Sequence, residues 1–319
     1  MRTIAITNLK GGVGKTTTVV NLGAGLSLKG LRVLLVDVDP QGNLATALGL
    51  QPKRTLYEVL IDGKSAAQCI VQARPNLDLL ASDATLMNAQ PLMTQRPDWA
   101  HLLSRALKPL GPQYDIALID CSASLSVMNV SALLAAGDVL VPTAVEHLAL
   151  RGIELLQQQL QRIGSGAIRA IIPTMYDSRQ RQSHELLKYL HTHYGALVTE
   201  PIRVNVRLSE APALGRTIYE HDPRSRGALD YAQLVEHVSQ KLGLSDARPA
   251  PQPAVAPAQT IPAQPAPQSA ESPLFQGPTH EPCPVCKHPL QQAVLAGYRV
   301  RYCDNCHYKR QELIQGVRR

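Results

Sequence analysis

Large aromatic residues are scarce in this chain of 319 residues, which contains one Trp and one Phe. A buried core must therefore be built from Leu, Val, Ile and Ala. The sequence also lacks any apolar run near the roughly 18 residues that a membrane-spanning helix requires. Because the chain enters a strand-like run at residues 1–6, it leaves no room for a signal peptide, and we expect a cytoplasmic protein.

Cysteine is sparse as well, and its placement is uneven. Cys69 and Cys121 are isolated, whereas the other four form two Cys-x-x-Cys pairs about sixteen residues apart: Cys283, Cys286, Cys303 and Cys306. In a reducing compartment such pairs indicate a metal site rather than disulfides. Four thiolates predict a structural Zn²⁺ whose binding supplies the folding free energy of a small zinc-ribbon-like module. The neighbouring His288 and His307 could replace a thiolate, but four cysteines are the simpler ligand set.

A strong excess of one charge sign is missing too. The formal net charge is +7 and the pI is near 9.1. Such a balance is compatible with a nucleic-acid partner, although solubility alone could explain it.

Strand-like apolar runs alternate with helix-like segments from residue 1 to about residue 245. This alternation predicts an α/β fold with a mostly parallel sheet flanked by helices, in which ligands bind at the carboxyl ends of the strands. The expected strands are 3–7, 32–37, 77–81, 115–120, 138–142 and 168–174, and the expected helices are 16–29, 99–107, 149–163, 183–193 and 227–242.

Composition then changes, because residues 247–280 are dominated by Pro, Ala and Gln. Such a segment cannot bury enough apolar surface to fold, and its prolines favour an extended spacer. We therefore expect three parts: an α/β domain at 1–246, a disordered linker at 247–280 and the cysteine module at 281–319.

A glycine-rich loop follows the first expected strand and precedes the first expected helix. It consists of Lys10, Gly11, Gly12, Val13, Gly14, Lys15, Thr16 and Thr17. Glycines let backbone N–H groups turn towards phosphate oxygens, and the helix N-terminus adds its positive dipole end. We expect Lys15 to reach the β- and γ-phosphates of ATP and Thr16 to ligate Mg²⁺. The leading glycine of the usual phosphate loop is absent, since Leu9 stands there.

This loop resembles the deviant Walker A motif of the ParA/Soj/MinD family, and the resemblance extends over about residues 1–245. It implies a P-loop NTPase domain in which Lys10 contacts ATP bound to the opposite subunit. The ATP-bound protein would then be a homodimer. A cation aimed at a partner's triphosphate gives a physical reason for dimerisation that depends on ATP.

Two acidic motifs match the same family. Asp39 matches the aspartate that orients the attacking water, with Asp37 nearer the strand, and the run ending at Asp120 resembles Walker B. The resemblance thus implies Mg²⁺ ligation by Thr16, Asp39 and Asp120, and transition-state charge neutralised by Lys10, Lys15 and Mg²⁺. Where the family usually has two prolines after Asp120 and Cys121, this chain has Ser122 and Ala123, which loosens the loop and puts the hydrolysis rate in doubt.

Arginines matching Arg179 and Arg207 help chromosomal members of the family to hold DNA without reading its sequence. The same half of the chain also contains Arg181, Arg203, Arg216, Arg224 and Arg226. The resemblance therefore implies a weak, partner-stimulated ATPase that binds the nucleoid as a dimer. A ParB-like protein or another partner would stimulate hydrolysis, and the cargo would be a chromosome, a plasmid or a protein assembly.

Two other interpretations stay open. The protein could be a nucleotide-gated adaptor that acts through protein binding by the zinc module. It could also be a MinD-like membrane-associated regulator, but the segment 311–319 is too short and polar for the amphipathic helix that this role needs.

Overall fold

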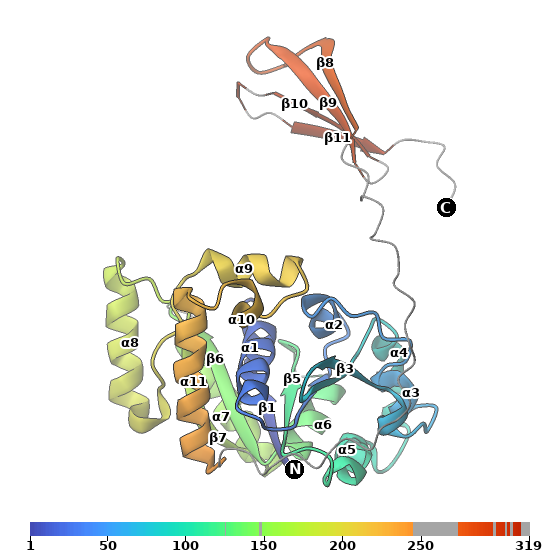
Figure 1. Ribbon diagram of the computed structural model, residues 1–319, viewed down its shortest axis with the longest axis vertical. Coiled ribbons are helices and arrows are strands. Elements are labelled where there is room, and N and C mark those ends of the chain that lie inside the picture. The colour runs from blue at the N-terminus through green and yellow to red at the C-terminus, as the bar shows by residue number, and fades with distance from the viewer. Residues whose placement is uncertain are drawn as a thin grey trace. The chain divides into compact units, whose positions relative to one another are not determined.

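The computed structural model describes residues 1–124, 126–146, 149–244, 274–295, 298–303, 305–306 and 309–313. The chain divides into two compact units, Met1–Pro251 and Gln252–Arg319 (Figure 1). Most of the predicted linker, up to residue 273, lies outside the described residues.

The first unit is built on a sheet of seven strands in the order β3-β4-β2-β5-β1-β6-β7. All neighbouring strands are parallel except β3 and β4, which are antiparallel. Every residue of β2, β5 and β6 is buried, which is the pattern of parallel strands covered on both faces. The strands are β1 (Arg2–Ile6), β2 (Val33–Asp37), β3 (Ile70–Arg74), β4 (Leu77–Leu80), β5 (Ile116–Asp120), β6 (Asp138–Ala144) and β7 (Ala167–Thr174).

Helices cover both faces of this sheet. They are α1 (Lys15–Leu28), α2 (Asn43–Ala47), α3 (Leu56–Leu60), α4 (Leu86–Thr94), α5 (Leu102–Leu107), α6 (Val127–Ala135), α7 (Ala149–Ile163), α8 (Arg181–Tyr194), α9 (Val206–Ala213), α10 (Ile218–His221) and α11 (Arg226–Leu242). Short 3₁₀ segments lie at Ala66–Gln68, Trp99–His101, Lys108–Leu110 and Gly195–Leu197.

The core is divided between the two faces of the sheet. Along β1, Ile4 and Ile6 pack with α1 and α11, whereas Ala5 packs on the opposite side with α6 and α7. In Figure 1, α1 and α11 lie in front of the sheet and α6 and α7 behind it. This two-sided burial confirms the predicted α/β class.

Helix α1 lies unusually close to its neighbours because its interior contains glycine. A Cβ at Gly23 would stand 2.7 Å from the side chain of Leu35, and one at Gly25 would stand 2.4 Å from that of Val235. Glycine in a helix costs about 1 kcal/mol relative to alanine. The close approach to β2 and α11 fixes the axis of α1, and its first turn follows the glycine-rich loop.

The expected strands all exist, with ends displaced by a few residues, and α7 has the expected bounds. Other elements differ from expectation. Strand β3 and the short helices α2, α3, α4, α6, α9 and α10 were not predicted, and the expected helix 99–107 is a 3₁₀ turn followed by α5.

The second unit contains an antiparallel sheet in the order β11-β10-β9-β8. Its strands are β8 (Leu274–Pro282), β9 (Pro289–Leu295), β10 (Tyr298–Tyr302) and β11 (Lys309–Leu313). Strand β8 begins at Leu274, within the segment 247–280 that the sequence predicts to be a linker. Pairing with β9 orders a segment whose composition alone favoured a spacer.

Candidate nucleotide site and cysteine cluster

The glycine-rich loop connects the end of β1 to the first turn of α1. Gly12 and Gly14 have φ angles of 73° and 83°, in the left-handed region that favours glycine. Gly14 occupies the N-cap position of α1, and among the described residues no side chain caps this end and no acidic residue lies in the first turn. The backbone N–H groups and the positive end of the helix dipole are therefore left for an anion.

Asn8 holds the start of this loop. Its side-chain oxygen accepts a hydrogen bond from the backbone N–H of Lys10 at 3.0 Å, and its amide donates to the carbonyl of Pro142 at 2.8 Å. On the other side, the hydroxyl of Thr174 donates to the carbonyl of Val13 at 2.9 Å. The loop is thus fastened to β6 and β7, and neither anchor was predicted.

The side chains of the two lysines of the loop have different partners. Nζ of Lys15 donates to the carbonyl oxygen of Lys10 at 3.0 Å, inside the loop. Burial lowers the pKa of Lys15, and the charge of Asp120 acts in the opposite direction. Lys10 forms an ion pair with Glu146, and 29% of its side chain is exposed.

Thr16 and Asp120 meet at the carboxyl end of the sheet. The Thr16 hydroxyl donates to Oδ2 of Asp120 at 2.7 Å, while Oδ1 of the same carboxylate is buried without a hydrogen-bond partner among the described residues. Burial, and next the neighbouring carboxylate of Asp37, raise the pKa of Asp120 well above its usual range. A buried, incompletely paired oxygen beside a hydroxyl fits the oxygen ligands that Mg²⁺ takes.

Asp37 stands beside Asp120 in the sheet, at the end of β2. Burial raises the pKa of Asp37 to about 7. Its carboxylate accepts hydrogen bonds from the backbone N–H groups of Asp39 at 3.0 Å and Leu44 at 3.1 Å. Asp37 therefore fixes both the loop that carries Asp39 and the first turn of α2.

The Asp39 loop is also held from the side of β4. The Ser82 hydroxyl donates to the carbonyl of Asp39, and Oδ1 of Asp39 accepts from the N–H of Gln41 at 3.0 Å. Gly42 has a φ of 64°, and a Cβ there would stand 2.7 Å from the Ser82 carbonyl oxygen. Asp39 itself is only half-buried, which leaves its carboxylate accessible.

The loop after Asp120, where the resemblance led us to expect two prolines, is held by hydrogen bonds. Asn129 donates to the carbonyl of Ser122 at 2.8 Å and accepts from its N–H at 3.2 Å. The hydroxyls of Ser122 and Ser124 lie 2.9 Å apart. A Cβ at Gly11 would stand 3.9 Å from that of Ala123, so this loop lies beside the glycine-rich loop. The expected loosening is thus opposed by a network centred on Asn129.

A cavity of about 440 Å³ opens beside the first turn of α1. Its lining comes from α1, the end of β7, the segment before α9, α9 itself and α11. The residues are Gly14, Thr17, Thr174, Met175, Ile202, Arg203, Val204, Asn205, Val206, Leu208, Ser209, Pro212 and Tyr231. The lining is largely apolar, which suits the flat face of a nucleotide base next to the phosphate loop. The sequence did not predict this cavity.

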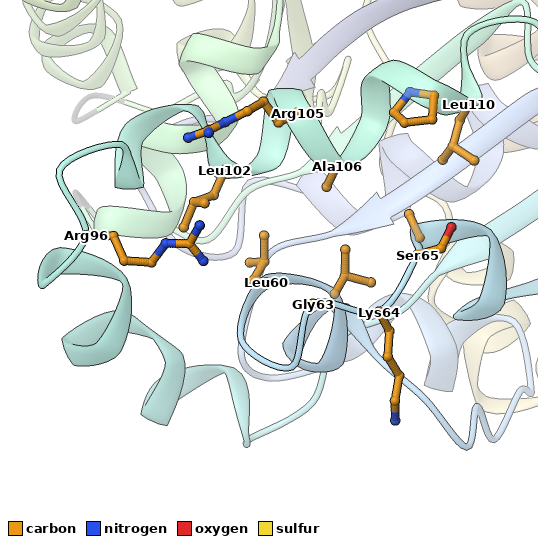
Figure 2. A pocket seen from close by; sticks show the side chains of 12 residues that line it. Leu60, Gly63, Lys64, Ser65, Arg96, Leu102, Arg105, Ala106 and Leu110 are labelled. Atoms are coloured by element: carbon orange, nitrogen blue, oxygen red, sulfur yellow. The ribbon is translucent and has the colours of Figure 1, made fainter.

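A second cavity, of about 380 Å³, has a different lining. Figure 2 shows it between α3 and the segment that contains α5, with Leu60 and Leu102 on its walls and Arg96 at its edge. None of its lining residues belongs to the glycine-rich loop or to the acidic strand ends. It is therefore separate from the candidate nucleotide site.

The predicted DNA-binding arginines lie on the surface. The side chain of Arg179 is 85% exposed and pairs with Asp177, and that of Arg207 is 53% exposed and pairs with Glu210 at 2.8 Å. Arg203, which belongs to the same predicted basic region, instead binds the buried carboxylate of Asp230. It holds the segment before α9 to α11 rather than facing solvent freely.

The four predicted metal ligands come together in the second unit. The Sγ atoms of Cys283, Cys286, Cys303 and Cys306 all lie within 4.8 Å of one another. The backbone N–H of Val285 points at Sγ of Cys283 at 3.4 Å, as in a tight metal-binding turn. Such a spacing of four sulfur atoms fits tetrahedral coordination of one zinc ion. His288 is exposed, and the described residues include no structure for His307.

Known proteins share the first unit of this chain. The sequence profile of the family described as AAA domain matches residues 1–171. The chromosome-partitioning ATPase Soj of Treponema pallidum is 38% identical over 245 residues, which cover 74% of this chain and 96% of that protein. The chromosome partitioning protein ParA of Caulobacter vibrioides is 38% identical over 251 residues, covering 75% and 94%.

A solved structure agrees with these sequence relatives. Cobyrinic acid a,c-diamide synthase from Mycobacterium smegmatis, crystallised with an ATP analogue and magnesium, is 32% identical with a TM-score of 0.66 and covers 76% of this chain and 96% of that one. It is named a synthase, whereas the relatives are named partitioning proteins. The nucleotide-binding fold is what they have in common.

The fold and the loop define a P-loop NTPase domain of the deviant Walker A type. Within that class, the chain belongs to the ParA/Soj family of ATPases, and its first unit corresponds to nearly the full length of the relatives. Among the described helices, none combines the length and apolar character needed to cross a membrane.

Proposed function

We propose that this protein is a positioning ATPase that dimerises when it binds ATP, holds DNA without reading its sequence and is released when a partner stimulates hydrolysis. The observation that carries the proposal is the convergence of Lys15, Thr16 and Asp120 with the half-buried Asp39 around an uncapped helix N-terminus.

The triphosphate of ATP lies along the glycine-rich loop, where backbone N–H groups face its oxygens. Lys15 turns from the Lys10 carbonyl to the β- and γ-phosphates. Thr16 and Asp120 would hold Mg²⁺, with Asp39 nearby, and a bound ion would supply positive charge to the phosphate oxygens. Asp39 orients the attacking water, and the base occupies the 440 Å³ cavity beside α1.

Lys10 gives the dimer its dependence on ATP. In the single chain its ammonium group is paired with Glu146, and both side chains are partly exposed. An exposed ion pair contributes only about 0–1 kcal/mol. The γ-phosphate of ATP in a second subunit is a stronger partner for Lys10, because it carries more charge and is less solvated inside an interface.

Arg179 and Arg207 supply the DNA contacts. Their exposed ion pairs can exchange a carboxylate for a phosphate at little cost. This surface would place the ATP-bound dimer on the nucleoid. The cysteine cluster of the second unit binds one structural Zn²⁺.

A direct test compares the wild type with Asp39→Ala and Lys15→Ala. Light scattering with ATP and Mg²⁺ should give twice the monomer mass for the wild type and a long-lived dimer for Asp39→Ala. Lys15→Ala should stay monomeric and show no ATP binding in calorimetry. The proposal fails if the wild type has the same mass with and without ATP, or if Asp39→Ala hydrolyses ATP at the normal rate.

The cysteine cluster lies in a unit of its own, which favours a second candidate function, a nucleotide-gated adaptor that works through this module. Ending the chain after residue 246 separates the two candidates. Unchanged DNA retention by the shortened chain supports the positioning ATPase, whereas loss of all activity, DNA retention included, supports the adaptor. Proteins that co-purify with Asp39→Ala would identify the cargo and the partner.

A further inference from the structure

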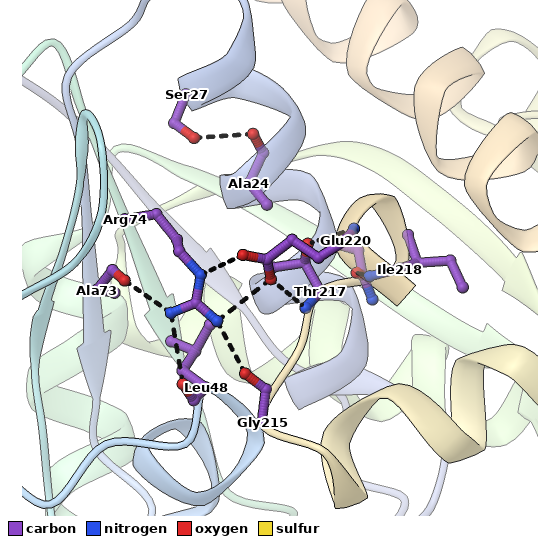
Figure 3. Close-up of polar contacts among 10 residues, drawn as sticks. Ala24, Ser27, Leu48, Ala73, Arg74, Gly215, Thr217, Ile218 and Glu220 are labelled. Carbon is purple, nitrogen blue, oxygen red and sulfur yellow. Dashed lines mark hydrogen bonds and ion pairs between the residues drawn. The ribbon is translucent and has the colours of Figure 1, made fainter. Parts of the chain in front are cut away.

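Strand β3 ends in Arg74, and the guanidinium group of this residue joins several segments (Figure 3). Nε and Nη2 donate to the carboxylate of Glu220, with Nη2 and Oε2 3.2 Å apart. Nη2 also donates to the carbonyl oxygen of Gly215 at 2.8 Å, and Nη1 donates to those of Ala73 at 2.6 Å and Leu48 at 3.4 Å. The side chain is 25% exposed; its bonds to the three carbonyl oxygens are partly buried, whereas those to Glu220 are exposed.

Two of these carbonyl groups mark the ends of helices. Leu48 is the C-cap of α2, and Gly215 directly follows Leu214, the C-cap of α9. Cations near such ends satisfy carbonyls that lack a partner within the helix. The two ends also touch, because a Cβ at Gly215 would stand 2.7 Å from the Cα of Gly49. Arg74 therefore fastens the ends of α2 and α9 to each other.

These two helices adjoin different parts of the candidate nucleotide site. Helix α2 begins directly after the Asp39 loop, and its Leu44 N–H is bound by Asp37. Helix α9 supplies Leu208, Ser209 and Pro212 to the lining of the 440 Å³ cavity. A displacement of either helix would change the distance between the hydrolytic loop and the cavity.

Glu220 extends the same connection to α1. Its carboxylate accepts from the N–H of Thr217 at 2.8 Å, and the next N–H, of Ile218, donates to the side chain of Asn21 at 2.8 Å. Burial would raise the pKa of Glu220, but the hydrogen bonds from Arg74 and Thr217 and the charge of Arg74 hold it below its usual value. Glu220 is therefore ionised at neutral pH, as the ion pair requires.

We propose that Arg74, together with Glu220, is a positioning residue of the ATP site that does not touch the nucleotide. By joining the ends of α2 and α9, it fixes the position of the base cavity on α9 relative to the Asp39 loop that precedes α2. This inference rests on the proposed function, since it needs ATP in that site. It assigns a role in binding the base and in hydrolysis to an ion pair outside the phosphate loop.

The test compares the affinities of the full-length protein for Mg·ATP and for Mg²⁺ with inorganic tripolyphosphate, which lacks the base. Arg74→Met should weaken ATP binding about tenfold and leave tripolyphosphate affinity within about twofold, because the phosphate loop is fastened separately to β6 and β7. Lower kcat should accompany the weaker binding.

Arg32→Met is the matched control. Arg32 forms a similar guanidinium–carboxylate pair with Asp115, with Nη2 and Oδ1 2.7 Å apart and 32% of the arginine side chain exposed. It directly precedes β2, whereas the glycine-rich loop and Asp39 lie at the carboxyl ends of the strands. Arg32→Met should lower the melting temperature as Arg74→Met does, with the affinities for both ligands unchanged.

Two further variants show how the pair works. Arg74→Lys keeps the charge but not the planar fork, so it should restore only part of the ATP affinity. Adding Glu220→Gln to Arg74→Met should cause little further loss, because the two side chains act as a unit. If Arg74→Met is too unstable to purify, Glu220→Gln alone gives the same comparison of ligands.

Equal loss of both ligands, or an effect no larger than that of Arg32→Met, overturns the positioning role while leaving the proposed function intact. If the wild type binds tripolyphosphate and ATP equally, the base does not contribute to binding in the cavity, and the inference is wrong too. A wild-type protein that binds neither overturns the proposed function itself.

Discussion

The hydroxyl of Thr16 and Oδ2 of Asp120 lie 2.7 Å apart, which connects the first turn of α1 to the end of β5. The second oxygen of this carboxylate is buried and has no hydrogen-bond partner in the described part of the chain. A buried carboxylate with a free oxygen is costly unless a cation or water completes its coordination. The Thr16–Asp120 pair thus predicts the position of the Mg²⁺ site.

Replacing Thr16 with valine tests this prediction. Thr16→Val keeps the shape of the side chain and removes the oxygen, so the gain in ATP affinity on adding Mg²⁺ should fall by about tenfold or more, as expected when one charge-assisted interaction is removed. Affinity without Mg²⁺ should stay near the wild-type value. Calorimetry with and without EDTA measures both quantities.

Thr18→Val is the control for that experiment. The Thr18 hydroxyl lies 3.2 Å from the Tyr231 hydroxyl, so it faces α11 rather than β5. This variant should keep the full response to Mg²⁺. An unchanged Mg²⁺ response in Thr16→Val would show that the ion binds elsewhere.

The ion pair of Lys10 with Glu146 predicts opposite effects for its two members. Lys10→Ala should bind ATP but fail to dimerise, because the cation that reaches the second subunit is gone. Glu146→Gln should dimerise at a lower ATP concentration, by a few-fold, since an exposed pair contributes up to about 1 kcal/mol. Sedimentation across an ATP titration measures the midpoint. Identical midpoints for the wild type and both variants would contradict the role assigned to Lys10.

Local chemistry made part of this site predictable. The role of a glycine or lysine between a strand and a helix, or of an aspartate at a strand end, is indicated by the residues next to it in the sequence. Asn8 and Glu146 gave no such signal, because their partners are 134 and 136 residues away. The same holds for Arg203, whose buried partner Asp230 removes it from the basic surface that composition suggested.

The elements that sequence reasoning missed are short or lie at an edge. Strand β3 contains the polar residues Gln72 and Arg74 within an otherwise apolar run, and none of its residues is fully buried. Its alternation of apolar and polar residues is therefore a weak signal for a strand. Helices α2 and α3 have five residues each, less than two turns, and depend on packing rather than on propensity. The Ser122–Asn129 network likewise replaces prolines by hydrogen bonds that only the fold brings together.

Arg179 and Arg207 should each carry part of the DNA affinity of the ATP-bound dimer. Arg179→Glu and Arg207→Glu should weaken binding to DNA of any sequence and reduce the slope of log affinity against log salt by about one for each phosphate that is no longer neutralised. Dimerisation should not change, because the substitutions leave the glycine-rich loop intact. Fluorescence anisotropy with labelled duplex DNA at several salt concentrations measures both effects.

Arg105→Glu provides the matched control for this surface. Its side chain is 53% exposed, as is that of Arg207, and it also forms an ion pair, with Asp98. It belongs to α5, outside the predicted DNA-binding region. If Arg105→Glu weakens DNA binding as much as the other two variants, the effect is one of net charge and not of a surface.

The cysteine cluster predicts one zinc ion per chain. Cys283→Ser should lose the zinc, because three thiolates do not complete the tetrahedral site, and the second unit should then lose its protection from protease. Cys69→Ser, at a buried cysteine of the first unit, should keep the metal. Elemental analysis of the purified proteins gives the zinc content. A zinc content near zero in the wild type would contradict the assignment.

Asp138 predicts a dependence of stability on pH that is separate from the nucleotide site. Its side chain, 5% exposed, lies at the start of β6 between Arg2 and Arg169, with Arg2 Nε 2.6 Å from Oδ2. Burial alone would raise the pKa of Asp138, but the hydrogen bonds and charges of the two arginines hold it below its usual value.

A carboxyl group whose pKa is lower in the folded state contributes stability that is present above its unfolded pKa of about 3.9 and is lost as pH falls through the folded pKa. Asp138→Asn should therefore reduce the free energy of unfolding by about 2 kcal/mol at pH 7. Both arginines are partly exposed, so the effect should lie in the middle of the usual range for a hydrogen bond to a charged group. The difference between the wild type and the variant should shrink steadily below pH 4. Urea unfolding at pH 7, 5, 4 and 3 measures it, with Asp62→Asn, at an exposed carboxylate, as the control. A difference that stays constant down to pH 3 would mean that the arginines do not hold the charged form of Asp138.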